Sequence, residues 1–122
     1  MKYEEITELI LKSAFEVAKE LGAGFLESVY EKAMIIALKQ NGLSVKDQHS
    51  ISVYFRNENV GNFYADLLVN DLVLIELKAV KALVPEHQAQ VINYLKATGI
   101  EVGLLINFGN SKLEYRRLEL RI

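Results

Sequence analysis

One strand-forming run in this sequence carries charged residues where a buried strand is normally apolar. Residues 72–78 read LVLIELK, and their Leu, Val and Ile content is typical of a central strand. Glu76 and Lys78 are two residues apart, so both side chains project from the same face of that strand. One strand earlier, Asp66 interrupts FYADLLV in the same way. Because an unpaired buried charge is costly, the chain must fold so that these groups pair, bind a metal ion or line a solvent-filled cleft.

The turn at residues 70–71 decides whether the two carboxylates meet. A plain two-residue loop would put Asp66 and Glu76 on opposite faces of the sheet. A three-residue loop or a one-residue bulge sets Asp66 opposite Glu76 and leaves Lys78 on the same face. We predict this second register because it also gathers the apolar residues of both strands on the other face. These residues are Phe63, Ala65, Leu67, Val69, Val73, Ile75 and Leu77.

The convergence of two carboxylates has a chemical consequence. Such a pair forms a hard-oxygen site suited to Mg²⁺ or Mn²⁺, and the sequence contains neither a cysteine nor a histidine cluster that would favour a softer metal ion. A lysine beside that ion can orient or deprotonate an attacking water, or stabilise charge that develops on phosphate. These are the parts of a phosphodiesterase. The residues leave one alternative open, a structural salt bridge in which Lys78 neutralises Asp66 and Glu76.

Length and composition limit the architecture and the partners. The chain has 122 residues, 51% of them hydrophobic, which is enough for one core and predicts a single domain over residues 1–122. With 14 basic and 16 acidic side chains the net charge is -2, which excludes binding of nucleic acid through bulk positive charge. The N-terminal segment alternates charged and apolar residues, unlike a signal peptide or a membrane span. We therefore expect a cytoplasmic protein with no membrane partner.

Hydrophobic periodicity predicts two helices, a three-stranded antiparallel meander, a third helix and two final strands. The predicted helices cover residues 2–21, residue 26 to a stop at Asn41-Gly42, and residues 85–97, and the predicted strands cover residues 45–55, 62–69, 72–78, 102–108 and 112–120. A turn is expected at residues 57–59. No repeat or linker indicates a second domain.

Two further sets of residues stand at helical spacing. Gly24, Glu27 and Tyr30 follow each other at intervals of three, so Glu27 and Tyr30 lie on neighbouring parts of one helical face. By spacing alone they indicate a helix-ending glycine, a solvated glutamate and a tyrosine at the edge of the core. Gln90 and Tyr94 are one turn apart on the third predicted helix, and by spacing alone they form an ordinary helix edge.

The stretch GFLESVY, residues 24–30, matches the GxxExxY motif of a family of small proteins assigned to the PD-(D/E)xK nuclease superfamily. The chain resembles this family over nearly its whole length. The resemblance implies an α/β (α+β), restriction-endonuclease-like fold with an αβββαβ core, in which helices flank a mixed central sheet. One extra helix precedes that core and one strand follows it. Ala65 stands where the superfamily motif has its proline, and no metal ligand is lost with that change.

The resemblance assigns the metal ligands. Asp66 is similar to the aspartate of the superfamily's second strand, and Glu76 is similar to the glutamate of its ExK motif. It implies that Asp66 and Glu76, with the backbone carbonyl of Leu77, bind Mg²⁺ or Mn²⁺. Glu27 is similar to the acidic residue that many members place on the first core helix, and the resemblance implies that it is a catalytic residue that completes the inner or outer coordination shell of the ion.

The resemblance also assigns the residues that act beside the metal. Lys78 is similar to the lysine of the ExK motif and is expected to act on the attacking water. Gln90 and Tyr94 resemble the QxxxY motif of the RecB-like branch. With Tyr30, they are expected to support the lysine or to bind substrate phosphate.

The function implied is metal-dependent hydrolysis of phosphodiester bonds in nucleic acid, with DNA as the expected substrate. The alternative is a catalytically inactive nucleic-acid-binding or assembly module on a nuclease-like scaffold, which the mildly acidic net charge favours a little. The C-terminal strand is a surface through which a homodimer could form. A second subunit or a partner protein could also add basic surface for nucleic acid. Because the site concentrates carboxylates, phosphate can approach only after a divalent cation has inverted the local charge.

Overall fold

The computed structural model describes residues 1–121, and its helices and strands follow the predicted order. The helices are α1 (Glu4–Leu21), α2 (Glu27–Gln40) and α3 (Pro85–Thr98), and the strands are β1 (Val45–Phe55), β2 (Glu58–Val69), β3 (Val73–Lys78), β4 (Val102–Asn107) and β5 (Glu114–Glu119). Pro85 opens α3, at a position where the missing N–H removes no helical hydrogen bond. Among the helices of the described chain, none combines the length and apolar content that crossing a bilayer requires.

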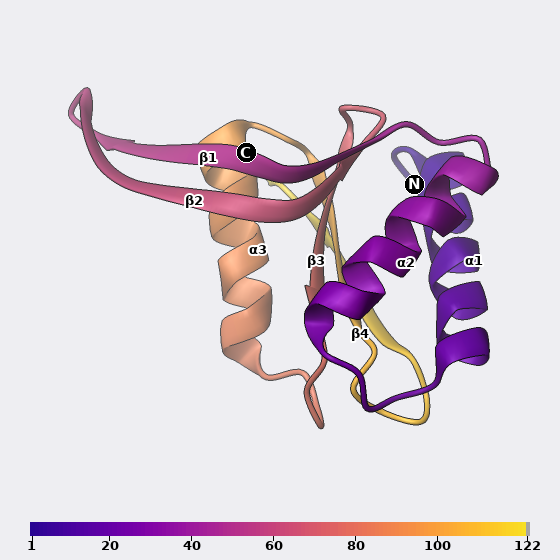
Figure 1. The fold of residues 1–122 in the computed structure, drawn as a ribbon. Helices are drawn as coiled ribbons and strands as arrows, with labels where there is room; N and C mark the ends of the chain where they lie inside the picture. The colour runs from indigo at the N-terminus through magenta and orange to yellow at the C-terminus, as the bar shows by residue number, and fades with distance from the viewer. Residues whose placement is uncertain (122) are drawn as a thin grey trace.

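The strands form one mixed sheet in the spatial order β1-β2-β3-β4-β5. β3 and β4 are parallel, and the other neighbours are antiparallel. Since a parallel pair needs a long crossover connection, α3 joins β3 to β4. α1 and α2 cover one face of the sheet and α3 covers the other (Figure 1). The predicted αβββαβ core is confirmed, with α1 and β5 as its additions.

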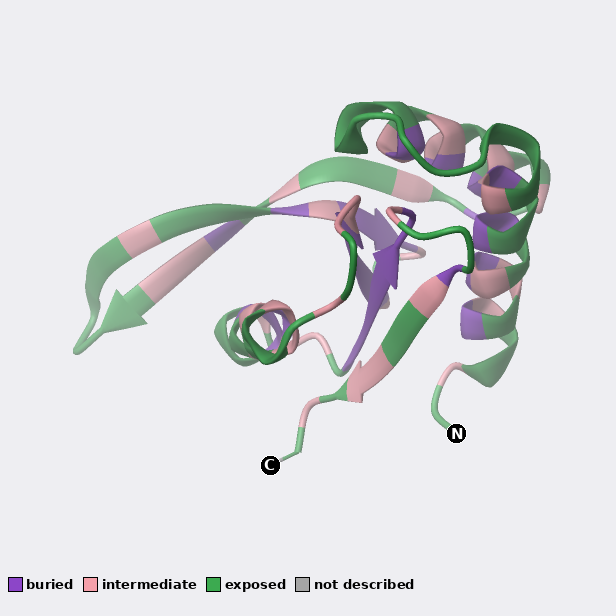
Figure 2. Ribbon diagram, turned by 90° about the horizontal axis from the view of Figure 1, so that it is seen from below, coloured by how far each residue is buried: buried purple, intermediate pink, exposed green. Residues whose placement is uncertain are grey.

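The sheet separates two apolar clusters. The larger cluster joins α1 and α2 to the sheet, and the smaller one lies beneath α3. Every residue of β4 is buried, as are the first five residues of β3 (Figure 2). Burial on both faces explains why these two strands are almost continuously apolar in sequence rather than alternating. It also means that a charged side chain on β3 lies in the interior of the protein.

The predicted register between β2 and β3 is confirmed. Val69 pairs with Val73, which leaves a three-residue loop, and the ladder continues to Leu67 and Ile75. Asn70 and Asp71 both have positive φ, 52° and 57°, a conformation that Asn and Asp tolerate better than most residues. One step further along this register, Asp66 stands opposite Glu76.

The predicted apolar face of β2 is wrong in its outer part. Leu67 and Val69 pack with α1 and α2 as expected, but Ala65 belongs to the cluster beneath α3, and Phe63 lies against Tyr94 of α3. Strand alternation alone would place Ala65 and Leu67 on one face. The β1–β2 ladder is interrupted between these two residues, where Gln48 has a φ of 50° and neither Gln48 nor Asp66 has a ladder partner. Beyond this interruption the outer residues of β2 face α3.

The β1–β2 hairpin is longer than predicted, and its outer half leaves the sheet as a two-stranded arm. Its turn consists of Arg56 and Asn57, with φ of 49° and 65°, and Phe55 pairs with Glu58. The turn predicted at residues 57–59 is therefore wrong. Two successive left-handed residues form the tight turn whose twist matches that of the strands. The arm passes over α3, and most of its surface is exposed (Figures 1 and 2).

Candidate active site

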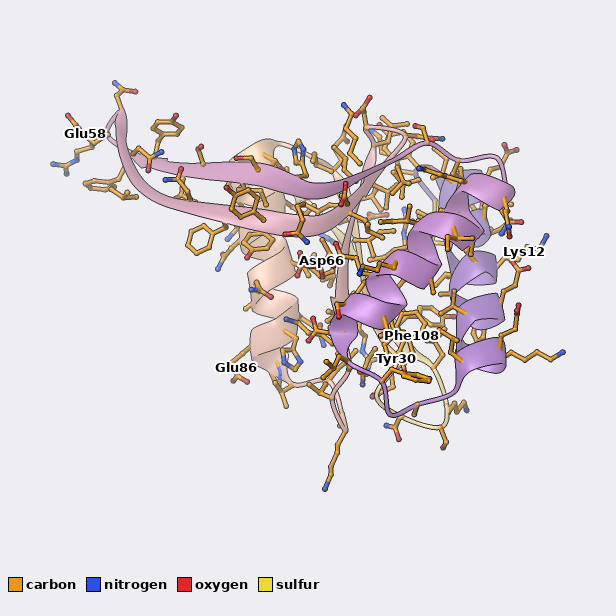
Figure 3. The ribbon with its side chains drawn as sticks, in the orientation of Figure 1. Lys12, Tyr30, Glu58, Asp66, Glu86 and Phe108 are labelled. Atoms are coloured by element: carbon orange, nitrogen blue, oxygen red, sulfur yellow. The ribbon has the colours of Figure 1, made fainter. Side chains whose placement is uncertain are left out.

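Asp66 and Glu76 meet where β2 and β3 stop pairing through their backbones. The ladder between these strands ends at Leu67 and Ile75. Just beyond, the amide of Asp66 donates to Oε1 of Glu76 at 3.0 Å, and the amide of Leu77 donates to Oδ2 of Asp66 at 2.7 Å. The two carboxylates thus replace backbone acceptors that the diverging strands no longer supply. Figure 3 shows Asp66 at the base of the hairpin arm.

The backbone carbonyl of Leu77 lies on the same edge of β3 as this pair. In an extended strand the N–H and C=O of one residue point to one edge, and those of the next residue point to the other. The amide of Leu77 is directed at Asp66, whereas the carbonyl of Lys78 accepts a hydrogen bond from the amide of Phe108 at 2.8 Å on the β4 side. The Leu77 oxygen therefore joins the two carboxylates as a third oxygen donor at this edge.

Burial raises the pKa of both carboxyl groups. Glu76 is 4% exposed, and desolvation, followed by the negative charge of Asp66, raises its pKa to about 8. The pKa of Asp66 is also raised, chiefly by desolvation, although the hydrogen bond from the amide of Leu77 opposes the shift. The charge of Lys78 lowers both pKa values without cancelling these effects. When both groups are ionised, the pair carries uncompensated negative charge in a largely dry environment.

Lys78 lies beside the two carboxylates but does not pair with them. Its Nζ donates to Oε1 of Gln90 at 3.3 Å, and Nε2 of Gln90 donates to the hydroxyl of Tyr94 at 3.2 Å. Within residues 1–121, Lys78 forms no ion pair with Asp66 or Glu76. Burial, followed by the charge of Glu76, raises the pKa of Tyr94, which keeps this hydroxyl protonated. The salt-bridge alternative is therefore disfavoured, and Gln90 holds the lysine instead.

Glu27, the first residue of α2, lies near the pair without joining it. Its side chain is exposed, and its negative charge raises the pKa values of both Asp66 and Glu76. The helix dipole stabilises an acidic residue in this position. In the part of the chain that the structure describes, no three His, Cys, Asp or Glu side chains lie close enough together to hold a metal ion. Two carboxylates are thus in place, and Glu27 lies outside ligand distance.

Tyr30 is fully buried and ties down the loop before α2. Its hydroxyl donates to the carbonyl of Gly22 at 2.6 Å and accepts from the amide of Phe25 at 3.2 Å. Its ring stacks on Phe108, with centroids 4.7 Å apart and planes 4° apart (Figure 3). With no exposed surface, Tyr30 supports the loop rather than offering a contact to substrate.

The GxxExxY motif has a physical explanation in this loop. Gly24 has a φ of 115°, where other residues are strained, and it lets the chain turn from α1 into α2. Tyr30 then fixes the turned segment from inside. The result is a fixed start for α2, which sets the position of Glu27 relative to the carboxylate pair.

The sequence is similar to that of a known protein family, and the fold is similar to that of a solved structure. The model of the PD-(D/E)XK nuclease superfamily matches residues 4–118. The chain belongs to the PD-(D/E)XK nuclease superfamily. Its fold is similar to the solved crystal structure of SSO0001, with a TM-score of 0.63 over 97% of this chain and 60% of that one, at 15% sequence identity. The chain therefore spans about 60% of the length of that protein, and the likeness concerns the fold alone. No curated protein matches the sequence.

Divalent metal ions are common cofactors in the PD-(D/E)XK superfamily, and the residues of this member fit such an ion. The edge of β3 offers two carboxylates and a backbone carbonyl, all hard oxygen donors of the kind that Mg²⁺ and Mn²⁺ prefer. The pKa values of Asp66 and Glu76 are raised although the charge of Lys78 lowers both, so the negative charge of the pair is only partly offset within the protein. A bound divalent cation would remove the repulsion between them.

The sequence patterns did not single out Asn107, although this residue fixes the loop behind Lys78. It is fully buried at the end of β4, where it pairs with Lys78 in the ladder. Its side chain accepts from the amide of Val80 and donates to the carbonyl of Val80, each at 2.9 Å, and also donates to Glu114 at 2.8 Å. A Cβ on Gly109 would lie 2.1 Å from the carbonyl oxygen of Val80, so only glycine fits there. The sequence feature that could have identified Asn107 is its position as a polar residue at the end of an otherwise apolar strand.

Proposed function

We propose that this member of the PD-(D/E)XK superfamily is a nuclease that hydrolyses phosphodiester bonds with the help of Mg²⁺ or Mn²⁺. One observation carries the proposal. Asp66 and Glu76 share a buried edge with raised pKa values, while the lysine next to them is held by Gln90 rather than spent in an ion pair. In a structural ion pair the lysine would contact the carboxylates directly. Carboxylates that are free to bind a cation, with a lysine beside them, are the arrangement that metal-dependent hydrolysis uses.

The ligand roles follow from the donor atoms. Asp66, Glu76 and the carbonyl of Leu77 hold the metal ion. Glu27, at the start of α2, adds negative charge near the ion without binding it directly. When bound, the ion supplies positive charge that offsets the carboxylates and polarises the scissile phosphate. Since the chain has a net charge of -2, this local charge is what makes the site accessible to a polyanion.

The remaining roles belong to β3 and α3. Lys78 orients the attacking water, assists its deprotonation and stabilises the charge that develops on phosphate. Gln90 fixes the lysine ammonium by accepting its hydrogen bond, and Tyr94 fixes Gln90 in turn. These contacts link the water-activating group to a helix and limit its freedom before substrate arrives.

Finer assignments belong to the same proposal. The matches to the GxxExxY and QxxxY patterns support a place among small, RecB-like members of the superfamily, with DNA as the substrate. We also propose that residues 1–122 act as a single domain in the cytoplasm. Any partner protein or second subunit would then add the basic surface that this chain lacks.

Cleavage assays test this function directly. Linear, nicked and single-stranded DNA, and RNA, are incubated with the wild type, Asp66→Asn and Lys78→Ala in the presence of Mg²⁺ or Mn²⁺. We expect the wild type to cleave at least one substrate and each variant to lose about 100-fold or more in rate, because each removes a group that stabilises charge in the transition state.

Matched controls come from the pair formed by Lys46 and Asp71, which is exposed and 2.8 Å apart. Asp71 lies five residues before Glu76, roughly 15 Å along an extended strand. Asp71→Asn and Lys46→Ala are therefore expected to cleave like the wild type. Equal rates in all five proteins would refute the proposal, and binding of nucleic acid without any cleavage would favour the inactive binding module instead.

A further inference from the structure

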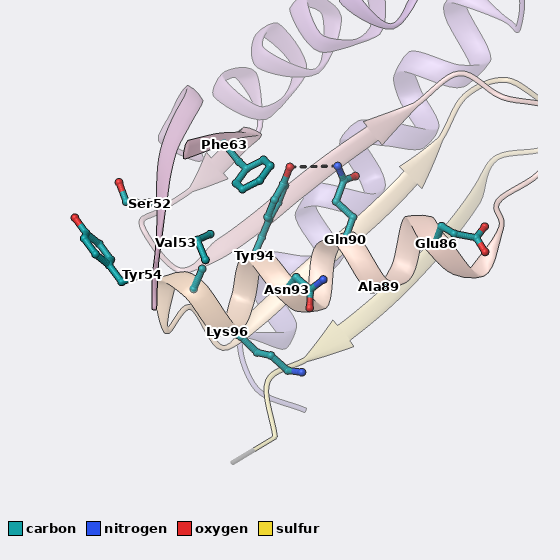
Figure 4. A pocket seen from close by; sticks show the side chains of 11 residues that line it. Ser52, Val53, Tyr54, Phe63, Glu86, Ala89, Gln90, Asn93, Tyr94 and Lys96 are labelled. Atoms are coloured by element: carbon teal, nitrogen blue, oxygen red, sulfur yellow. Dashed lines mark hydrogen bonds between the residues drawn. The ribbon is translucent and has the colours of Figure 1, made fainter. Parts of the chain in front are cut away.

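A groove of about 800 Å³ runs between the hairpin arm and α3. One wall is α3, from Glu86 to Ala97, and the other is the inner side of the arm around Phe63 and Tyr54 (Figure 4). Its volume is in the range of sites that enclose small organic groups. No sequence pattern indicated it, since it exists only because the arm twists over the helix.

The groove is continuous with the candidate active site. Gln90 and Tyr94 line it, and the same two side chains form the hydrogen-bonded path from Lys78. Figure 4 shows the ring of Phe63 beside that of Tyr94, with Gln90 bonded to the Tyr94 hydroxyl. A group bound in the groove can therefore contact Gln90, which is hydrogen-bonded to Lys78, the lysine that we place at the scissile phosphate.

The lining is aromatic and close to neutral. Phe63 is 46% exposed and lies beside Tyr94 inside the groove, whereas Tyr54 is 63% exposed and lies at its outer rim (Figure 4). The charged side chains of the lining are one anion, Glu86, and one cation, Lys96. Such a surface suits flat, uncharged rings and offers little to a row of phosphates.

We propose that this groove binds the bases of an unpaired nucleic-acid strand, so that the substrate class of the enzyme is single-stranded nucleic acid; this inference rests on the proposed nuclease function. Bases in a duplex hide their faces by stacking on one another and cannot offer them to Phe63 or Tyr54. Unpaired bases can, and stacking on aromatic side chains is the usual way in which proteins hold single strands without reading their sequence.

The groove also sets the position of the strand relative to the candidate active site. A base that stacks on Phe63 brings its own phosphate towards Gln90 and Lys78, where hydrolysis is proposed. The following bases extend along α3, where the amide of Asn93 can bond to a base edge and Lys96 can contact a phosphate. The arm and helix therefore act as a clamp on one side of the scissile bond.

The hairpin arm provides a matched pair of variants to test the groove. Tyr54 and Phe63 line it, whereas Phe55 and Tyr64 are on the same arm, are 59% and 58% exposed, and lie outside it. Tyr54→Ala with Phe63→Ala, and Phe55→Ala with Tyr64→Ala, remove the same two kinds of ring from the two locations. Phe63→Leu is a milder third variant that keeps apolar cover over Tyr94.

The measurement is fluorescence anisotropy with a labelled oligothymidine of about 12 nucleotides, the matching oligouridine and a duplex of the same length. Ca²⁺ replaces Mg²⁺ to prevent cleavage, and thermal melting verifies that each variant is folded. We expect the wild type to bind the single strands at least about tenfold more tightly than the duplex. The groove variant should lose at least about tenfold in that affinity and Phe63→Leu should lose part of it, while the control variant binds like the wild type.

Equal affinity for single strands and duplex would overturn the inference, as would equal losses in the groove and control variants. A preference for oligothymidine over oligouridine would identify DNA as the strand, and the reverse would identify RNA. If the wild type cleaves nucleic acid and the groove variant binds it with unchanged affinity, the nuclease function is supported and the role of the groove in binding is refuted. Groove-dependent binding without any cleavage would refute the nuclease and leave a single-strand-binding module.

Discussion

The backbone amide of Asp66 donates a hydrogen bond to the carboxylate of Glu76 at 3.0 Å, so the residue that faces Glu76 in the site also holds it in place. β2 and β3 are joined at this level by side chains rather than by a backbone ladder. A change to either carboxylate therefore acts on the junction of the two strands as well as on the chemistry. For variants of Asp66 or Glu76, a loss of activity must therefore be compared with the change in the free energy of unfolding.

Stability should fall as pH rises between about 4.5 and 8 because of Glu76. Its pKa is raised from 4.5 to about 8 in the folded protein, so the folded state binds the proton that the unfolded state has already lost. The contribution is fully present below pH 4.5 and is lost as pH rises through the folded pKa, with a slope of at most about 1.4 kcal/mol per pH unit. Asp66, whose pKa is also raised, acts in the same direction.

Urea denaturation of the metal-free protein across this pH range measures the effect. Glu76→Gln should flatten the pH dependence, since the amide mimics the protonated acid and has no proton to lose. Glu58→Gln, at the exposed tip of the hairpin arm, is the control and should follow the wild type. An identical slope in Glu76→Gln and the wild type would show that another group is responsible.

Mn²⁺ should bind to the wild type and raise its melting temperature, and Asp66→Asn should abolish both effects. Binding of a ligand to the folded state alone stabilises it by about 2.7 kcal/mol when the free ligand is at about 100 times its dissociation constant. Affinity should increase with pH up to about 8, because the ion must displace the proton from Glu76. Calorimetric titration measures both quantities. Saturable binding retained in Asp66→Asn, or lost in the remote variant Asp71→Asn, would contradict the assignment.

Replacing Gln90 by leucine should slow cleavage by about 10- to 100-fold while leaving Mn²⁺ binding intact. The side chain carries no metal ligand, but it accepts the hydrogen bond of Lys78 and donates one to Tyr94. Without it the lysine ammonium loses its fixed position. Gln88→Leu, on the same helix and outside the groove lining, is the control. Steady-state cleavage rates test this prediction. Equal rates in the two variants would show that Gln90 does not contribute to cleavage.

Tyr30→Phe should destabilise the protein by about 1–2 kcal/mol, because it removes two hydrogen bonds that the buried hydroxyl forms with the backbone of the loop. The hydroxyl that is removed bonds to the carbonyl of Gly22 and the amide of Phe25, while the ring stacked on Phe108 remains. The exposed residue change Tyr64→Phe should cost almost nothing. Chemical denaturation compares the two, and a cost of similar size in both would show that the loop does not depend on the Tyr30 hydroxyl.

Part of the site could be predicted because it depends on local rules. The β2–β3 register followed from the composition of the turn and from side-chain alternation, and it placed Asp66 opposite Glu76. The order of helices and strands followed from apolar spacing in the same way. Both properties repeat every few residues, and so they are already present in the linear sequence.

Other features depend on how elements pack against each other. Ala65 and Phe63 face α3 because the strand alternation breaks where Gln48 has a positive φ, and no periodicity in the sequence indicates that break. Whether Lys78 would neutralise the carboxylates or bond to Gln90 depended on where α3 docks. Asn107 gained its role only when the loop at Val80 folded back over β4.

The sequence by itself determined that two carboxylates and a lysine would share one face of neighbouring strands. The tertiary structure decided that the lysine stays free of them and that an aromatic groove leads to them. Alternation along a strand is set by backbone geometry within a few residues, so the sequence contains it directly. Contacts between α3, the arm and β3 depend on the twist and docking of whole elements, which are settled only when the two apolar clusters pack.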